Sequence, residues 1–195
     1  MKHRGKIFFF AGFAASLSAG WYGFPKVLYE RSPQPLAFNH QAHTGEKVGM
    51  KCEDCHGFRA DGTFAGIPGV ENCAGCHAEP LTESADEKIL VEKYVKPNRE
   101  IPWLVYSRQP ENVFFNHASH VTLAKLACEE CHGEHGKTTT LRPFERNRIS
   151  GYSRDIWGPS IARISTAKRP GMKMDDCAQC HRENGRESAC LDCHK

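Results

Sequence analysis

The sequence has no isolated cysteine. All ten cysteines of the 195-residue chain belong to five short units of one form, Cys-x-x-Cys-His. The five units are Cys52/Cys55/His56, Cys73/Cys76/His77, Cys128/Cys131/His132, Cys177/Cys180/His181 and Cys190/Cys193/His194. A disulfide framework does not require a histidine after each pair, so this pattern argues against one.

Long hydrophobic runs are scarce as well. One uncharged run extends from Ile7 to Phe24, after three basic residues. Eighteen helical residues span ~27 Å, just short of the bilayer hydrocarbon core. A signal peptide has the same polarity, but Trp21 and Tyr22 at the outer edge are typical of a membrane-spanning helix. We expect residues 1–30 to be an uncleaved transmembrane anchor with a cytoplasmic N-terminus.

The five cysteine units carry the attachment signature of haem c. Two thiols one helical turn apart bond to the vinyl groups, and the adjacent imidazole ligates the iron. Structural zinc is the alternative, because Cys-x-x-Cys pairs also form four-thiolate sites, but zinc does not require the histidine. The sequence therefore predicts five covalent haems, with the histidine of each unit as proximal ligand.

The remaining histidines match the number of haems. Of eleven histidines, five are in the units and His3 precedes the apolar run. The other five are His40, His43, His117, His120 and His135. If these supply the sixth ligands, every iron has two imidazoles, which favours electron transfer over small-molecule chemistry. Met172 and Met174 are alternatives for one position, since a thioether also ligates haem.

Four of these histidines lie in two copies of one segment. Phe-Asn-His-x-x-His occurs at residues 38–43 and 115–120, each time ahead of haem motifs. Histidines three positions apart leave one helical turn side by side, so each pair can reach two different irons. The chain thus contains a degenerate internal repeat, at residues 38–77 and 115–194.

This pattern resembles the class III multihaem cytochromes c, small periplasmic proteins. The resemblance implies that the first histidine of each pair ligates the nearest haem and the second ligates another. His40 would serve the Cys52/Cys55 haem, His43 the Cys73/Cys76 haem, His117 the Cys128/Cys131 haem and His120 the Cys177/Cys180 haem. His135 would then fall to the fifth haem, by elimination.

The chain is too short for an ordinary core around each haem. Residues 28–195 provide about 34 residues per haem, so the haems themselves are expected to form the core. We expect a mostly irregular head with short α-helices. Its parts are a two-haem module at 36–80, a helix and extended connector at 81–112, and a three-haem module at 113–195 with a haem-free arm at 137–173.

Two haem-free stretches carry further signals. Ser84 and Glu87 have the spacing of a capping box and predict a helix over 84–96, before Pro97. The arm at 137–173 has nine basic residues and two acidic ones. It is either a solvated linker or, because it contains apolar side chains, an arm along a partner subunit with arginines reaching haem propionates.

The net charge of the head depends on the cofactor. Without Lys2, Arg4 and Lys6, the 26 basic residues fall to 23 and balance the 23 acidic ones. Two propionates per haem would add up to about ten negative charges. We therefore expect an acidic head, with no nucleic-acid partner.

The order of motifs resembles the multihaem subunit of two related membrane assemblies. "PLAFNHQAHTGEKVGMKCEDCH", "AGIPGVENCAGCH" and "GMKMDDCAQCHR" are similar to segments of alternative complex III and of the menaquinone reductase complex of sulfate-reducing bacteria. The ending "ACLDCHK" favours the second. The resemblance implies an inner-membrane subunit with a single anchor and a periplasmic head, not an enzyme by itself. It would pass electrons between a soluble, basic multihaem cytochrome and an iron–sulfur subunit with a polytopic quinone-binding subunit.

The alternative is a single-anchor multihaem quinol dehydrogenase that oxidises quinol directly. An open, high-spin haem and quinol oxidation by the isolated chain would favour it. A multihaem enzyme such as a nitrite reductase also needs a free iron position, and the histidine count argues against that.

Overall fold

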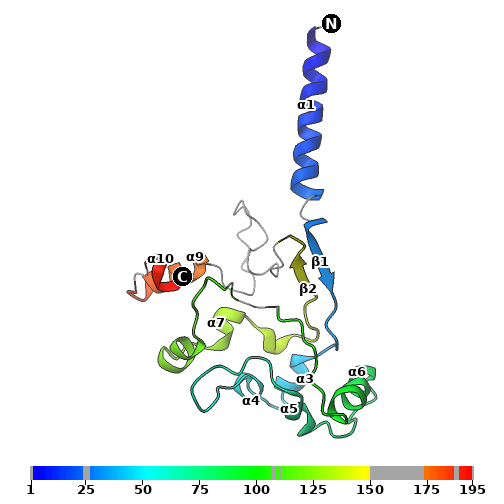
Figure 1. Ribbon diagram of the computed structural model, residues 1–195, viewed down its shortest axis with the longest axis vertical. Helices are drawn as coiled ribbons and strands as arrows, with labels where there is room; N and C mark the ends of the chain where they lie inside the picture. The colour runs from blue at the N-terminus through cyan, green and yellow to red at the C-terminus, as the bar shows by residue number, and fades with distance from the viewer. Residues whose placement is uncertain are drawn as a thin grey trace.

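A long N-terminal helix projects away from a head of short helices and irregular chain (Figure 1). The computed structural model describes residues 2–23, 27–106, 109, 111–149, 174–186 and 189–194. The N-terminal helix α1, Lys2–Ser18, continues directly as a π-helical turn, η1, Ala19–Gly23. Its large apolar side chains are exposed, among them Phe8 at 75%. None of the helices in these described ranges is both long enough and apolar enough to cross a membrane.

A two-stranded sheet lies at the base of this helix. Strand β1, Tyr29–Ser32, pairs antiparallel with β2, Phe144–Asn147. An ion pair of 2.6 Å joins Arg31 to Glu145 across the strands. Neither strand was predicted from the sequence, and of the two alternatives for the arm at 137–173 the solvated linker does not hold for β2. The arm is fastened here to the chain that follows α1, and its residues 150–173 lie outside the described part.

The head consists of short helical segments, as expected from the sequence. They are α3 (His40–Thr44), α4 (Cys52–Cys55), α5 (Val70–Ala74), α6 (Ala85–Leu90), η2 (Val91–Val95), η3 (Ala118–Leu123), α7 (Cys128–His132), η4 (His135–Lys137), α9 (Met174–Glu183) and α10 (Cys190–Cys193). Four of the five Cys-x-x-Cys pairs form a helical turn in α4, α7, α9 and α10, and the fifth starts in α5. The motifs are therefore local helical turns held by irregular chain.

The protein core is small and lies at one end of the head. In the described part, the buried hydrophobic side chains are those of Leu36, Val70, Val91, Tyr94 and Ile101. All but Val91 form one cluster, and Cys73 packs against it. The described part of the head therefore has only a small protein core.

The predicted helix over 84–96 is present, but the predicted capping box is wrong. Ser84 is the N-cap of α6, yet its side chain makes no capping hydrogen bond. Glu87 does not reach back to Ser84 and instead accepts hydrogen bonds from Leu81, Thr82 and His77. Donors outside the helix thus outcompete the single backbone N–H that a capping box would satisfy.

Candidate functional site

The two Phe-Asn-His-x-x-His segments place their aromatic rings in the same arrangement. The centroid of the Phe38 ring lies 4.9 Å from that of His40 and 4.7 Å from that of His43. In the second copy the Phe115 ring lies 4.8 Å from both His117 and His120. In each copy the first imidazole meets the phenyl ring edge-on and the second stacks on it. The phenylalanine therefore orients both imidazoles of its pair.

The asparagine of each segment fixes the second imidazole. The side chain of Asn39 caps α3 by accepting from the Ala42 N–H at 3.0 Å. The backbone carbonyl of Asn39 accepts from Nδ1 of His43 at 2.9 Å, and that of Asn116 accepts from Nδ1 of His120 at 2.8 Å. A ring whose Nδ1 donates to a carbonyl presents an unprotonated Nε2, which is the nitrogen available to a metal.

The structure brings together three of the five imidazole pairs that the resemblance implies. His43 and His77 have ring centroids 6.1 Å apart, His117 and His132 are 6.3 Å apart, and His120 and His181 are 6.1 Å apart. Two imidazoles on opposite sides of one metal, each with a bond of ~2.0 Å, have centroids about 6 Å apart. The three gaps therefore fit a bis-histidine iron.

The described ring contacts do not include the other two expected pairs, His40 with His56 and His135 with His194. His135 lies beside His40, with ring centroids 6.4 Å apart. Thr138 joins the two, because its hydroxyl donates to the His135 carbonyl and lies 3.3 Å from Nδ1 of His40. No ring contact in the described residues links a histidine to His56 or His194. The assignment of His135 to the fifth haem thus has no support in the geometry.

Burial affects both of these neighbouring rings. It lowers the pKa of His40, with smaller contributions from the nearby His56 and His43. Burial, and then Arg142, lowers the pKa of His135 to about 4. Neutral imidazoles are the form that binds a metal. His40 is also near enough to His56 to influence it, which keeps His40 a candidate for the Cys52/Cys55 haem.

Of the methionine alternatives, Met174 is 64% exposed and Met172 lies outside the described residues.

Two of the predicted proximal imidazoles are oriented by different partners. Nδ1 of His56 donates to the carbonyl of Gly66 at 2.8 Å. Gly66 has φ +80, a conformation that favours glycine, and this turn aims its carbonyl at the ring. Nδ1 of His77 donates instead to a carboxylate, Oε1 of Glu87, at 2.7 Å. The Thr82 hydroxyl, and then the Leu81 N–H, hold the pKa of Glu87 at about 2, despite the opposing effect of burial.

The first three cysteine motifs are neighbours in space. The Asn72 amide in α5 donates to the carbonyl of Asp54 in α4 at 3.2 Å. On the other side of α4, Sγ of Cys52 lies 3.8 Å from Glu129 in α7. Burial, followed by the nearby Cys128 thiol, raises the pKa of Cys52 to about 11. The motif at α4 therefore lies between those at α5 and α7.

The row continues from α7 to the C-terminal motifs. Burial raises the pKa of Cys177, and Cys131 of α7 and Cys193 of α10 both contribute. The His117/His120 segment also connects α7 with α9, because its two rings face His132 of α7 and His181 of α9. The N–H of Phe114 donates to the Cys193 carbonyl at 2.7 Å. The five motifs thus follow the order α5, α4, α7, α9, α10, which Figure 1 shows running from the end of the head far from α1 back towards it.

The second cysteine of the α9 motif has a polar neighbour that the sequence analysis did not predict. Cys180 is expected to bond to a haem, and Nδ2 of Asn184 lies 3.7 Å from its Sγ. The same Nδ2 donates to the Cys180 carbonyl at 2.9 Å, because Asn184 follows the last turn of α9 and folds back over it. A thioether sulfur is also a weak acceptor, so this contact is compatible with a haem bond. Burial, and then Cys180, raises the pKa of Cys131, which agrees with α9 lying next to α7.

The donor set fits haem c. None of the ten cysteines, all of which lie within the described residues, forms a disulfide, and each is at least partly accessible. The imidazole gaps leave space for an iron. In the described ranges no three histidine, cysteine or acidic side chains converge on a point as a metal-ion site would require. The adjacent histidines would be the proximal ligands, and the thiols that would hold the porphyrins are those of Cys52, Cys55, Cys73, Cys76, Cys128, Cys131, Cys177, Cys180, Cys190 and Cys193.

Sequence analysis missed several orienting residues. Phe38 and Phe115 had a signal, since both recur at one position of the repeat. Phe64, which stacks on His117 at 4.1 Å, had none. Glu87 gave a misleading signal, because its spacing from Ser84 predicts a cap.

Two comparisons with known proteins agree with this geometry. The sequence profile of the Class III cytochrome C family matches residues 24–100. This span holds the first histidine pair and the first two motifs, so the class III resemblance is confirmed there. The chain is also 34% identical over 202 residues to the menaquinone reductase multihaem cytochrome c subunit of Nitratidesulfovibrio vulgaris, with 96% of this chain and 89% of that protein covered. The chain therefore belongs to the family of multihaem cytochrome c subunits that includes this menaquinone reductase subunit.

Proposed function

We propose that this chain is the electron-transfer subunit of a membrane menaquinone oxidoreductase complex, and not an enzyme by itself. The observation that carries the proposal is the row of five cysteine motifs with three histidine pairs spaced for iron. Iron with two imidazole ligands has no open position, so it exchanges electrons rather than binding substrate. A row of such centres relays electrons across the head. The similarity over most of the chain to a menaquinone reductase subunit names the kind of complex.

In this proposal the chain holds five covalent haems. His43, His117 and His120 are the distal ligands of the haems whose proximal ligands are His77, His132 and His181. His40 serves the Cys52/Cys55 haem, which its proximity to His56 supports. For the haem of Cys190 and Cys193 the described geometry supports no distal ligand.

The chain is proposed to be a single-pass protein of the inner membrane with its head in the periplasm. Support comes from α1 and η1, which run on without a break and expose aromatic side chains along their length. Its partners within the complex are an iron–sulfur subunit and a polytopic quinone-binding subunit. Its soluble partner is a basic multihaem cytochrome, which suits a head made acidic by haem propionates.

Purification of the native complex from membranes tests the proposal. The intact mass of this chain should exceed that of the polypeptide by five haems, with no titratable thiol. An iron–sulfur protein and a polytopic membrane protein should co-elute with it. A smaller mass gain would contradict the haem assignment, and elution of the haem-loaded chain alone would contradict the complex.

One observation favours the alternative of a single-anchor quinol dehydrogenase. His194 makes no ring contact with another histidine in the described residues, which leaves the Cys190/Cys193 haem as the place for an open iron position. The same preparation distinguishes the two functions. A high-spin haem signal together with quinol oxidation by the isolated chain would support the dehydrogenase, and low-spin signals alone support the relay.

A further inference from the structure

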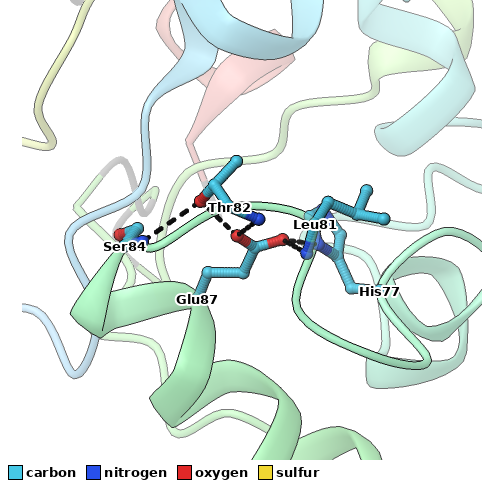
Figure 2. A network of polar contacts seen from close by, with 5 residues as sticks. All are labelled: His77, Leu81, Thr82, Ser84 and Glu87. Atoms are coloured by element: carbon cyan, nitrogen blue, oxygen red, sulfur yellow. Dashed lines mark hydrogen bonds and ion pairs between the residues drawn. The ribbon is translucent and has the colours of Figure 1, made fainter.

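A carboxylate lies directly behind the proximal imidazole of the Cys73/Cys76 motif. Glu87 is 9% exposed, and Ile89 and Leu90 of the same helix pack against the core cluster. Its Oε1 accepts from Nδ1 of His77 at 2.7 Å and from the Leu81 N–H at 2.8 Å. Its Oε2 accepts from the N–H of Thr82 at 2.8 Å and also from the Thr82 hydroxyl. Figure 2 shows these donors converging on the one carboxylate.

The arrangement is fixed by the small protein core. Helix α6 continues into η2, which contributes Tyr94 to the core cluster. Cys73 packs against the same cluster from α5. The helix that carries Glu87 and the helix that carries Cys73 are thus held by one packed unit.

The partner of His77 differs in kind from those of the other imidazoles whose ring hydrogen bonds are described. His43, His56 and His120 donate to neutral backbone carbonyls, and the partner of His40 is the neutral hydroxyl of Thr138. A buried carboxylate draws the Nδ1 proton more strongly and makes the imidazole a stronger donor to iron. Both effects stabilise the more positive, oxidised iron.

We propose that Glu87 is a positioning residue that lowers the reduction potential of the Cys73/Cys76 haem, through its hydrogen bond to Nδ1 of His77. This inference rests on the proposed function, because it requires a haem on Cys73 and Cys76. The motif is at the end of the row farthest from α1 (Figure 1). A low potential there suits the first acceptor of an electron from a ferrous soluble cytochrome, which is oxidised by one electron as this haem is reduced. The Nδ1 proton stays on His77, so no proton is exchanged.

Glu87→Gln in the full-length, haem-loaded protein tests the inference. The neutral amide should raise the midpoint of one low-spin haem. We expect about a tenfold change in its oxidised-to-reduced ratio at fixed potential, which is ~59 mV for a one-electron couple. Redox titration followed by electron paramagnetic resonance resolves the individual haems. Glu83→Gln is the matched control, because Glu83 is an exposed carboxylate in the adjoining turn that pairs with Lys88, and it should move no midpoint.

A second variant gives the opposite sign. Thr82→Val removes a competing donor from the carboxylate and leaves its charge, so Glu87 should bind His77 more strongly and the same midpoint should fall. A merely structural role predicts that both variants shift the midpoint in the same direction, and that result would overturn the inference. An unchanged midpoint in Glu87→Gln would also overturn the inference about Glu87, while the proposed electron-transfer function would be unaffected. If the wild-type mass shows no haem on Cys73 and Cys76, the proposed function fails instead.

Discussion

The two haems served by His117 and His120 should influence each other's potential by an amount that the structure sets. Both ring centroids lie 4.8 Å from the Phe115 centroid, so they are at most about 9.6 Å apart. Each iron would lie about 3 Å beyond its ring, which gives an iron–iron distance of at most ~16 Å. One unit of charge at ~16 Å, with an effective dielectric constant of ~20, corresponds to ~1 kcal/mol. For a one-electron couple this is a shift of ~45 mV.

Two reciprocal variants make this shift measurable. Replacing a ligating imidazole by a thioether raises the potential of that haem. His117→Met should therefore make the His132 haem reduce first, and His120→Met should do the same for the His181 haem. A haem whose neighbour is already reduced is harder to reduce. The informative variant is the one that reverses the order in which the two haems are reduced in the wild type. In that variant the haem that was formerly reduced first has a reduced neighbour, so its midpoint should fall by ~45 mV or more.

The assay is a redox titration of the haem-loaded protein with each haem followed by electron paramagnetic resonance. His43→Met is the control, because it acts on the Cys73/Cys76 haem, three motifs away from His181 in the row. It should leave the midpoint of the His181 haem unchanged. If neither reciprocal variant moves the midpoint of the untouched haem, the two irons are not tied by one segment and the ligand assignment is refuted.

Two further predictions concern stability and docking. Val70→Ala removes two methyl groups from a side chain that is 2% exposed, which should cost ~2–3 kcal/mol and lower the Tm by about 4–12 °C in calorimetry. Val48→Ala, at a side chain that is 57% exposed, should cost less than ~0.5 kcal/mol, and equal losses would contradict the assigned core. Stopped-flow reduction by a small basic cytochrome should slow as salt rises, since charges are screened over ~10 Å at 0.1 M. A rate indifferent to salt, or faster with an acidic donor, would contradict an acidic dock.

Much of the site could be predicted from the sequence because its chemistry is local. Both thiols and the proximal imidazole of each motif lie within five consecutive residues, and a single helical turn brings them together. The repeated histidine segments are equally local. Asn39 caps α3 by accepting from the N–H three residues further on, and its backbone carbonyl orients His43. The spacing alone therefore predicts the paired imidazoles.

The sequence also predicted the loop-rich head with a small core, but it failed where distant segments compete. Strand β2 was read as part of a polar arm, because its pairing with β1 connects residues more than a hundred positions apart. Glu87 was read as a helix cap from a three-residue spacing. In the folded chain the turn at Leu81 and Thr82 and the imidazole of His77 offer it more donors than the helix end does.

The sequence by itself determined which residues are the candidates for binding haem, how many motifs there are, and that the histidines come in pairs. Only the tertiary structure decided which imidazole faces which motif and in what order the motifs lie. His120 meets His181 across 61 positions of the chain, and His135 meets His40 rather than the last motif. The reason is physical: bonding within a helical turn is fixed by backbone geometry, whereas a contact between distant turns depends on how the whole chain packs.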